Sequence, residues 1–432
     1  MRILFLNPFH GGSHAAVAEG YARRSRHQVT LLSLSIAGGW RWRMRGAAVT
    51  LARRLRALPA ERFDLIVTTD MLDLATFLGL TRDLTAGTPV ALYMHENQLT
   101  YPLPPGRTRD LAFPWINYTA ALAADALFFN SDFHRRAFLE ALPGLPGRYH
   151  DHQELDLIDA IAARSEVLPP GIDLARLDVT HAGVGEALPP QPAPGVVGGA
   201  GASRPHPAEG AAARGVEESP SGHPAPGVAG GVGESFLQLT HHRPGAAGPV
   251  ILWNSRWEYD KAPQAFFGAL RELETRGVSF QVIVAGESVD PQEPSFAAAR
   301  DWLAPRTLHW GYAPDLETYC RLLHRADIVV STAVQEFFGI AVVEAMYCGC
   351  VPVLPRRLSY PELLPPQHHA TCLYEDGALA ERLQAVIADI ETLRTRDFRA
   401  VAAPYDWSHM APRYDAAFER VAGRAQARHV VQ

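Results

Sequence analysis

The chain has 432 residues and a formal net charge of −6, with 47% hydrophobic and 20% charged residues. These values are typical of a globular protein with more than one domain. They exclude a basic field over the whole molecule, so any nucleic-acid site must be local. The sequence also lacks a run of about 18 apolar residues, so we expect no membrane-spanning helix and no stable membrane insertion.

The N-terminal part alternates apolar runs with helical stretches. Met1–Leu6 predicts a first strand, with a loop over Asn7–His14 and a helix from about Ala15. Further strands are predicted at Phe63–Thr68, Pro89–Met94 and Ala126–Asn130, and helices at Met71–Leu80 and Tyr118–Ala124. Strands that alternate with helices favour a parallel, doubly wound sheet.

The composition changes between about Thr180 and Ser235, where Ala, Gly, Pro and Val dominate. The segment PAPGVVGGAG at 192–201 is nearly repeated as PAPGVAGGVG at 224–233. Such a stretch cannot bury enough apolar surface to offset its ordering entropy. We therefore predict a disordered insertion at a domain boundary, without a catalytic role.

A second alternation begins at Gly248. It predicts strands at Pro249–Trp253, Phe280–Ala285, Asp327–Ser331 and Val351–Pro355, and helices at Ala262–Arg276, Gly339–Tyr347 and Leu379–Leu393. The predicted fold class is α/β, with two Rossmann-like domains that face a cleft. Ligands of such sheets bind outside the carboxyl ends of the strands. The predicted bounds are 1–179 for the first domain, 180–247 for the insertion, 248–404 for the second domain and 405–432 for a crossover helix and tail.

The four cysteines, Cys320, Cys348, Cys350 and Cys372, all lie in the C-terminal part. Cys348 and Cys350 are too close for a usual zinc pair, and no second pair stands at ligand spacing. We expect reduced, buried thiols in a cytoplasmic protein and no metal site.

Lys261 is the only lysine, since 39 of the 40 basic residues are arginine. It stands five residues after Arg256, between a predicted strand and a predicted helix. A helix N-terminus favours anions, and two added cations predict a diphosphate site. A compact ammonium fits where a planar guanidinium would not. The alternative is a surface salt-bridge cluster with Glu258 and Asp260.

Glu336 and Glu344 are eight residues apart, with Gly339 between them. Carboxylates accept hydrogen bonds from two sugar hydroxyls at once. The first amides of the helix that begins at Gly339 would hold a phosphate. Gly286, at another strand end, permits close approach of a base or sugar. The alternative is a helix-capping Glu336 and a solvated Glu344.

Together these residues resemble the signature of retaining GT-B glycosyltransferases of family 4, over residues 248–425. The resemblance implies that Arg256 and Lys261 hold the donor diphosphate, that Glu336 binds the hexose and that Glu344 binds the ribose. It also implies a nucleotide sugar as substrate, without a metal or cofactor, and the chain has no Asp-x-Asp pair. The other donor-binding positions expected are Gly12, Asn254, Gly286, Glu287, Tyr312, Phe338, Gly339 and Ile340.

The N-terminal motifs are more unusual. They are FHGGSH at 9–14, GGWRWRMRGAA at 38–48, YMHENQLTYP at 93–102 and FFNSDFHRRAF at 128–138. Together they resemble the tRNA-queuosine α-mannosyltransferase group, over about residues 1–172. The resemblance implies transfer of mannose from GDP-mannose to queuosine in a tRNA anticodon, with His95 near the transferring sugar. The acceptor-binding residues expected are His14, Trp40, Arg41, Trp42, Arg43, Arg45, Glu96, Asn97 and Gln98.

Several alternatives stay open at this point. His95 is also explained as a satisfied histidine at a strand end. The tract Trp40–Arg56, with six arginines, two tryptophans and no acid, suits RNA but equally an exposed amphipathic helix or a membrane surface. The acceptor could be a lipid or polysaccharide, or the chain could be an inactive GT-B-like RNA-binding protein. The sequence does not fix the hexose, the nucleotide base or the oligomeric state.

Overall fold

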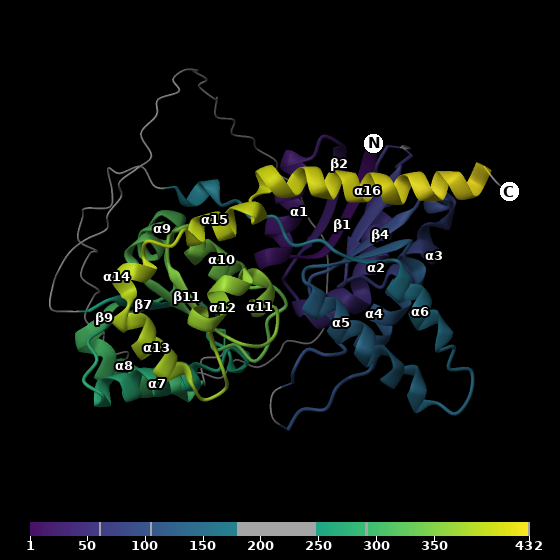
Figure 1. The fold of residues 1–432 in the computed structure, drawn as a ribbon. Coiled ribbons are helices and arrows are strands. Elements are labelled where there is room, and N and C mark those ends of the chain that lie inside the picture. Colours follow the sequence, from purple (N-terminus) through teal and green to yellow (C-terminus); the bar gives the residue numbers. More distant parts are fainter. Residues whose placement is uncertain (60–61, 104–105, 179–247, 290–292, 431–432) are drawn as a thin grey trace, which may run out of the picture. The chain divides into compact units, whose positions relative to one another are not determined.

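The computed structural model describes residues 1–59, 62–103, 106–178, 248–289 and 293–430, with the backbone alone for 425–430. Within these ranges the chain forms two parallel sheets of six strands each, drawn in Figure 1. The predicted α/β class with two Rossmann-like domains is therefore confirmed. The predicted insertion at 180–247 lies outside the described residues.

The N-terminal sheet has the strand order β2-β1-β3-β4-β5-β6. Its strands are β1 (Arg2–His10), β2 (Gln28–Ser35), β3 (Leu65–Thr69), β4 (Val90–Met94), β5 (Ala126–Phe129) and β6 (Ser165–Val167). The helices along it are α1 (Gly12–Arg24), α2 (Gly39–Ala57), α3 (Leu74–Thr85), α4 (Ala112–Ala123), α5 (Asp132–Ala141) and α6 (Asp156–Ala163).

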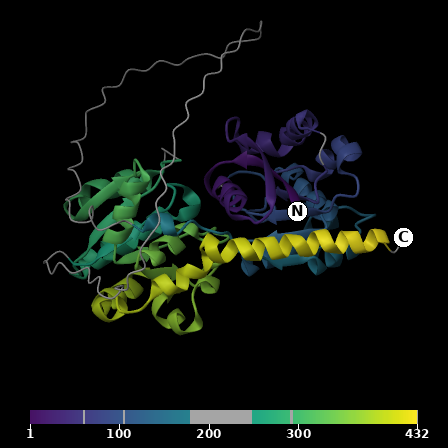
Figure 2. The same ribbon diagram turned by 90° about the horizontal axis from the view of Figure 1, so that it is seen from above.

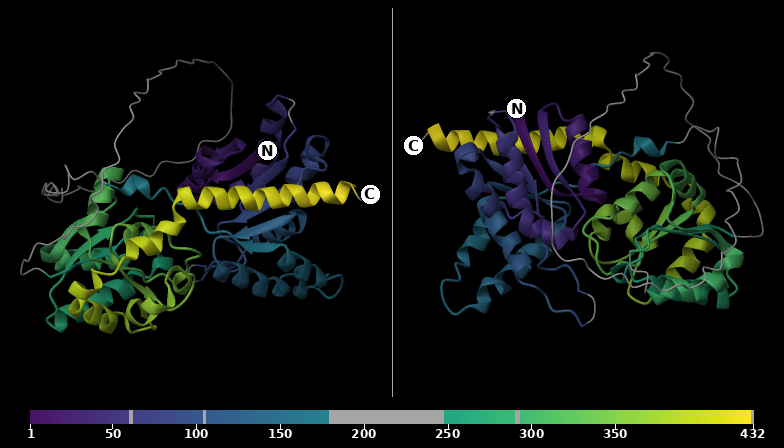
Figure 3. Two further views of the ribbon diagram at one scale, coloured as in Figure 1. Left: turned by 45° about the horizontal axis from the view of Figure 1, so that its top comes forward. Right: turned by 180° about the vertical axis from the view of Figure 1, so that it is seen from behind.

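The C-terminal sheet has the order β12-β11-β10-β7-β8-β9. Its strands are β7 (Val250–Trp253), β8 (Gln281–Ala285), β9 (Thr307–Gly311), β10 (Ile328–Val330), β11 (Val351–Pro355) and β12 (Leu373–Tyr374). Its helices are α7 (Pro263–Thr275), α8 (Pro294–Leu303), α9 (Leu316–Arg325), α10 (Ile340–Tyr347), α11 (Tyr360–Leu363), α12 (Pro366–Cys372), α13 (Leu379–Ala388), α14 (Ile390–Leu393) and α15 (Phe398–Ala402). The two views of Figure 3 show helices on both faces of these sheets.

The last helix, α16 (Trp407–Val430), packs on the N-terminal sheet, as Figures 1 and 2 show. Trp407 is buried against Gly20 and Gly171, where an added Cβ would overlap its indole. The hydroxyl of Tyr21 donates to Asp415 at 2.9 Å. The chain thus returns to its first sheet, and glycine at these two positions makes room for the tryptophan. The predicted domain bounds stay a prediction.

Some local predictions were wrong. β1 continues through Asn7 to His10, which we expected in a loop, because this segment pairs with β2 out to Ser35. Strands β2, β6, β9 and β12 were not foreseen, since each lies at or next to a sheet edge and has a weaker apolar pattern. The helix predicted over Leu379–Leu393 is interrupted at Asp389.

The predictions about thiols and membrane spans can also be compared with the structure. All four cysteines are free and buried. In the described ranges, no helix combines the length and the apolarity needed to cross a bilayer.

Candidate active site

Lys261 ends the short 3-10 helix η4 (Tyr259–Lys261), which follows β7 and leads into α7. Its ammonium donates to the carbonyl of Gln335 at 2.9 Å and lies 3.3 Å from a Glu336 carboxylate oxygen and 3.4 Å from Asp260. The side chain is only 11% exposed. Burial alone would lower the pKa of Lys261, but Glu336 and Asp260 more than offset it, so the pKa is raised and the group stays charged.

Arg256 lies in the loop before η4 and pairs with Glu258 at 3.2 Å. Its guanidinium is about half exposed. The ion pairs of the alternative interpretation therefore do form, between Arg256 and Glu258 and between Lys261 and Asp260. However, Lys261 and Asp260 are buried, which a surface cluster would not explain.

Glu336 belongs to the loop that leads into α10. One of its carboxylate oxygens accepts the amide of Phe338 at 3.4 Å, and the other faces Lys261. Gly339 is the N-cap of α10 with φ at 103°, a conformation that favours glycine. The hydroxyl of Ser359 donates to the carbonyls of Glu336 and Phe338, which fixes the loop. The fold thus brings Lys261 and Glu336 together, although they are 75 positions apart in the sequence.

Glu344 is 5% exposed, so it is not the solvated acid of the alternative interpretation. It accepts hydrogen bonds from Arg176 at 2.6 Å and from the hydroxyl of Tyr319 at 2.9 Å. Asn254 donates to the same Tyr319 hydroxyl at 3.3 Å and to the carbonyl of Ala341 at 2.9 Å. Asn254 and Glu344 therefore meet through Tyr319, which the sequence analysis missed together with Arg176.

The other predicted donor residues differ in their surroundings. Gly286 directly follows β8, and a Cβ there would overlap the carbonyl of Ser255, so only glycine fits. The backbone carbonyl of Glu287 accepts the amide of Trp257 at 2.8 Å, beside Arg256 in sequence. Tyr312 is 70% exposed and is not brought to Lys261 by any described contact. Of the two residues beside Gly339, Phe338 is buried against Tyr405 and Ile340 opens α10.

His95 follows β4 at the carboxyl end of the N-terminal sheet. Its amide donates to Asp70 at 2.8 Å, and its carbonyl accepts from Asn130 at 2.8 Å. Its ring lies 4.1 Å from that of His14, and its Nε2 is buried without a hydrogen-bond partner among the described residues. Burial, with smaller contributions from His14 and His134, holds the pKa of His95 well below its usual value, so the ring is neutral.

Four other buried polar atoms, from residues close to His95 in the sequence or in space, also have no hydrogen-bond partner among the described residues. They are Nδ1 of His14, Nε2 of His134, Nδ2 of Asn97 and one carboxylate oxygen of Asp70. Burial lowers the pKa of His14 to about 4 and that of His134 to about 3. Buried polar groups in folded proteins are nearly always paired with protein or water. These atoms therefore need buried water or a polar ligand to complete their hydrogen bonds. Gly12 opens α1 with φ at 52°.

The loop after β4, which contains Glu96, contacts the loop after β7. Burial raises the pKa of Glu96 to about 7, and the charge of Arg256 and a hydrogen bond from Gln98 partly oppose this. Tyr101 donates to Asp260 at 3.3 Å, and Tyr259 donates to the carbonyl of Pro102 at 2.7 Å. Tyr101 and Pro102, which follow HENQ, thus bring the loop after β4 into contact with the NSRWEYDK segment.

The WRWRMR tract lies in α2, and its side chains have different partners. Trp40 packs 4.9 Å from Phe113, and Arg41 lies 4.4 Å over the Trp40 ring. Arg45 pairs with Asp110 at 2.7 Å. Arg43 donates to the carbonyls of Ser35 and Ala37, and Trp42 is 60% exposed. Trp40 shares an apolar cluster with Phe9, whose ring is 5.7 Å from that of His14.

The residues that the sequence analysis missed are Asp70, Asn130, His134, Arg176 and Tyr319. Asp70 follows β3 and His134 opens α5, so their position after predicted strands was an available signal. No sequence motif marks Arg176 or Tyr319, and only the fold brings them to Glu344.

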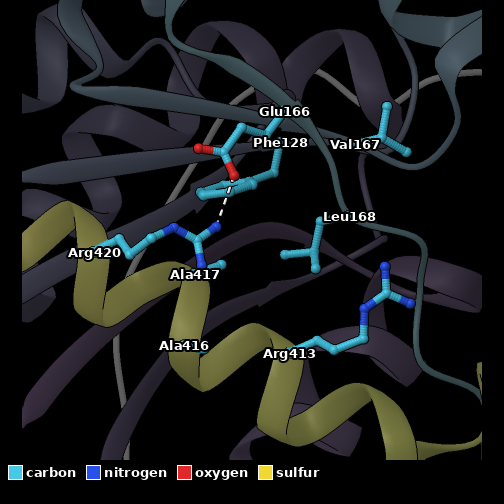
Figure 4. A pocket seen from close by; sticks show the side chains of 8 residues that line it. All are labelled: Phe128, Glu166, Val167, Leu168, Arg413, Ala416, Ala417 and Arg420. Atoms are coloured by element: carbon cyan, nitrogen blue, oxygen red, sulfur yellow. Dashed lines mark hydrogen bonds and ion pairs between the residues drawn. The ribbon is translucent and has the colours of Figure 1, made fainter.

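A separate cavity of about 210 Å³ lies between α16 and the edge strand β6. Figure 4 shows Arg413 and Arg420 rising from α16 toward Glu166, Val167 and Leu168. Arg420 pairs with Glu166 at 2.7 Å. None of the predicted site residues lines this cavity.

Comparison with known proteins identifies both parts of the chain. Residues 2–172 match the family model described as tRNA-queuosine alpha-mannosyltransferase N-terminal. Residues 248–389 match the family model described as Glycosyl transferases group 1. The chain is a glycosyltransferase. The enzyme is 28% identical over 367 residues to the tRNA-queuosine alpha-mannosyltransferase of Drosophila melanogaster, which covers 85% of this chain and 82% of that protein.

Other relatives are similar over shorter lengths. A GDP-mannose:cellobiosyl-diphosphopolyprenol alpha-mannosyltransferase of Xanthomonas campestris is 28% identical over 43% of this chain and 51% of that protein. Among solved structures, HepE of Anabaena in complex with UDP has a TM-score of 0.60 at 15% identity, covering 97% of this chain and 100% of that chain. Sucrose-phosphate synthase of Thermosynechococcus elongatus has a TM-score of 0.64 at 16% identity, covering 98% and 100%. At these identities the structures support the GT-B fold alone.

Proposed function

We propose that this glycosyltransferase moves mannose from GDP-mannose to queuosine in the anticodon of a tRNA, with retention at the sugar. The observation that carries this proposal is the match of residues 2–172 to the N-terminal part of tRNA-queuosine alpha-mannosyltransferase. The relative with that name spans 85% of the chain, so the likeness extends over both sheets. A tRNA substrate places the enzyme in the cytoplasm.

The proposal for the donor rests on the buried cation at the end of β7. Lys261 and Arg256 hold the diphosphate, whose oxygens replace Glu336, Asp260 and Glu258 as partners of these cations. Once freed from Lys261, the carboxylate of Glu336 accepts hydrogen bonds from the hexose. Relatives named for GDP-mannose, such as those of Xanthomonas campestris and Mycobacterium tuberculosis, support mannose as the sugar.

Glu344, Asn254 and Tyr319 form the proposed ribose subsite. Both oxygens of Glu344 already have one donor each, from Arg176 and Tyr319. A carboxylate has about four acceptor positions, so Glu344 keeps capacity for ribose hydroxyls. Gly286 and Glu287, after β8, are the proposed neighbours of the base, and the carbonyl of Ser255 requires glycine at 286.

The chemistry of the step follows from these charges. The acceptor hydroxyl attacks the anomeric carbon on the face that the diphosphate leaves, and the departing phosphate oxygen takes the hydroxyl proton. Lys261 and Arg256 stabilise the negative charge that develops on the leaving diphosphate. His95 is neutral, and its Nε2 has no hydrogen-bond partner in the described part of the chain; it positions a hydroxyl by hydrogen bonding and does not act as a charged acid.

The experiment that tests the proposal incubates the full chain with tRNA that carries queuosine and with GDP-mannose, UDP-glucose or UDP-galactose. Nucleosides from the digested tRNA are then analysed by mass spectrometry. We expect a hexose mass gain on queuosine with GDP-mannose alone, and none on tRNA with guanosine at the same position. No mass gain with any donor would overturn the proposal, and a gain with a UDP-sugar alone would overturn the donor assignment.

A further inference from the structure

Most arginines of α2 already have a structural role. Arg43 and Arg54 donate to backbone carbonyls of β2 and its following turn, while Arg45 and Arg56 pair with Asp110 and Asp83. Arg41 and Arg53 form no ion pair with the described residues. Arg41 contacts the Trp40 ring, and both side chains are exposed.

Trp42 is a large apolar side chain that stays 60% exposed on the same helix. Gly46 lies one turn later, and a Cβ built on it would lie 2.8, 2.9 and 3.2 Å from three adjacent atoms of the six-membered indole ring. Distances that are nearly equal to three neighbouring ring atoms mean that Gly46 lies under the face of the ring. The opposite face is the one left for solvent.

Glycine inside a helix is destabilising relative to alanine, because its backbone loses more conformational freedom on folding. At Gly46 the three nearest heavy atoms to an added Cβ all belong to Trp42. The glycine therefore makes room for the indole of Trp42. A helix position that gives up stability to hold an exposed ring flat indicates a role for the free face of that ring.

The charge around Trp42 indicates which kind of ligand would stack on the ring. Residues 20–60 contain nine arginines and no Asp or Glu. Arg53 stands 11 residues after Trp42, which returns to the same side of the helix about 16 Å further along. A flat aromatic face suits a stacked base with its phosphates where Arg41 and Arg53 are exposed on the same helix and no acid is nearby in sequence.

We propose that Trp42, laid flat on Gly46, is a stacking platform for one unpaired base of the acceptor RNA, with Arg41 and Arg53 against the flanking phosphates. The proposal rests on the proposed function, since it assumes an RNA acceptor. It separates Trp42 from Trp40, which packs inward against Phe113 beside Phe9 and His14. Trp42 thus holds a base outside the chemical centre.

The first test measures binding of the full chain to a labelled anticodon stem-loop by fluorescence anisotropy. Trp42→Ala should weaken binding about tenfold, because one base–aromatic stack is lost. Trp42→Phe should retain most of the affinity, and so should the control Val49→Ala, which alters an exposed apolar residue two turns further on. Wild-type affinity in Trp42→Ala would overturn the proposal.

The second test uses Gly46→Ala, which displaces the indole while it favours the helix. We expect an unchanged or higher melting temperature together with severalfold weaker binding of the stem-loop. A fully paired RNA duplex should bind wild type and variant alike. Undiminished stem-loop affinity in Gly46→Ala would contradict the platform. Loss of binding to phosphatidylglycerol vesicles but not to RNA in Trp42→Ala would instead indicate a membrane surface and overturn the proposal.

Kinetics of the transfer reaction distinguish failure of the Trp42 platform from failure of the proposed function. Trp42→Ala should raise the KM for queuosine tRNA about tenfold and leave the KM for GDP-mannose unchanged. Unchanged KM for tRNA would overturn only the platform. A wild-type enzyme that transfers no hexose to queuosine tRNA would overturn the proposed function, whatever Trp42 does.

Discussion

The ends of β7 and β4 carry two polar groups of very different construction. Around Lys261 every charge has an opposite partner, in Asp260, Glu336 or the nearby pair of Arg256 and Glu258. Around His95 the groups are mostly neutral, and several buried nitrogens have no described partner. A diphosphate can replace carboxylates as the partner of a cation, whereas sugar hydroxyls need neutral donors and acceptors. The two ends thus match a charged donor and an uncharged acceptor hydroxyl.

The largest effect should come from removing the charge at the end of β7. Lys261→Ala takes away the buried cation, and we expect kcat/KM for transfer to fall by at least roughly 10²–10³-fold. Lys261→Arg should also be impaired, because the side chain is only 11% exposed and a planar guanidinium does not fit the same contacts.

The control for Lys261 is thermal unfolding of both variants beside wild type. Removing the cation leaves Asp260 and Glu336 without their partner, so the alanine variant will also lose some stability. The arginine variant keeps the charge and separates folding from catalysis. Transfer within tenfold of wild type in a folded Lys261→Ala enzyme would refute the phosphate role.

A smaller effect is expected at the uncharged end. His95→Ala should lower kcat about 100-fold with little change in the KM for GDP-mannose, since the loss of one positioned hydrogen-bonding group costs a factor in this range. Because the pKa of His95 lies well below its usual value, the wild-type rate should show no imidazole limb near pH 6.5. Such a limb, lost in His95→Ala, would mean that the ring titrates and that the contrast between the two ends is wrong.

The site residues that could be predicted from the sequence lie in loops that directly follow an apolar strand. Lys261 and Glu336 both follow predicted strands, and the parallel sheet places β7 beside β10, so their approach was predictable from the fold class. Asp70 was predictable in the same way, since β3 lies beside β4, but a lone acid after a strand gave no distinctive pattern.

Other contacts could not be read from the sequence. Arg176 reaches Glu344 across 168 positions, and this contact depends on how the chain before residue 179 lies against α10. The predicted length of β1 was wrong because pairing with the edge strand β2 determines where β1 ends. The predicted roles of the site residues stay predictions until the variants are measured.

Glu96 lies in the loop after β4 that contacts the loop after β7, and we expect its titration to have a moderate effect on stability. Burial raises its pKa to about 7, so the folded state binds this proton more tightly than the unfolded state does. The corresponding stability is fully present below about pH 4.5 and is lost as the pH rises through 7. Glu96→Gln should therefore melt at a higher temperature than wild type at pH 8, with a smaller difference at pH 5.5. Equal differences at both pH values would contradict the burial of this charge between the two loops.

The smallest expected effects distinguish a structural arginine of α2 from one that contacts RNA. Arg43→Gln loses hydrogen bonds to Ser35 and Ala37 and should lower the free energy of unfolding by about 1 kcal/mol, without changing the salt dependence of RNA binding. Arg41→Gln loses only the exposed contact with the Trp40 ring and should lower the unfolding free energy by about 0.5 kcal/mol. It should reduce the slope of log K against log salt by about 0.7–0.9, the value for one phosphate contact. Urea titrations and anisotropy at several salt concentrations measure both quantities. Equal losses of RNA affinity in the two variants would mean that Arg43 also faces the nucleic acid. In that case its backbone hydrogen bonds would not define its role, and the tract would act as one basic surface.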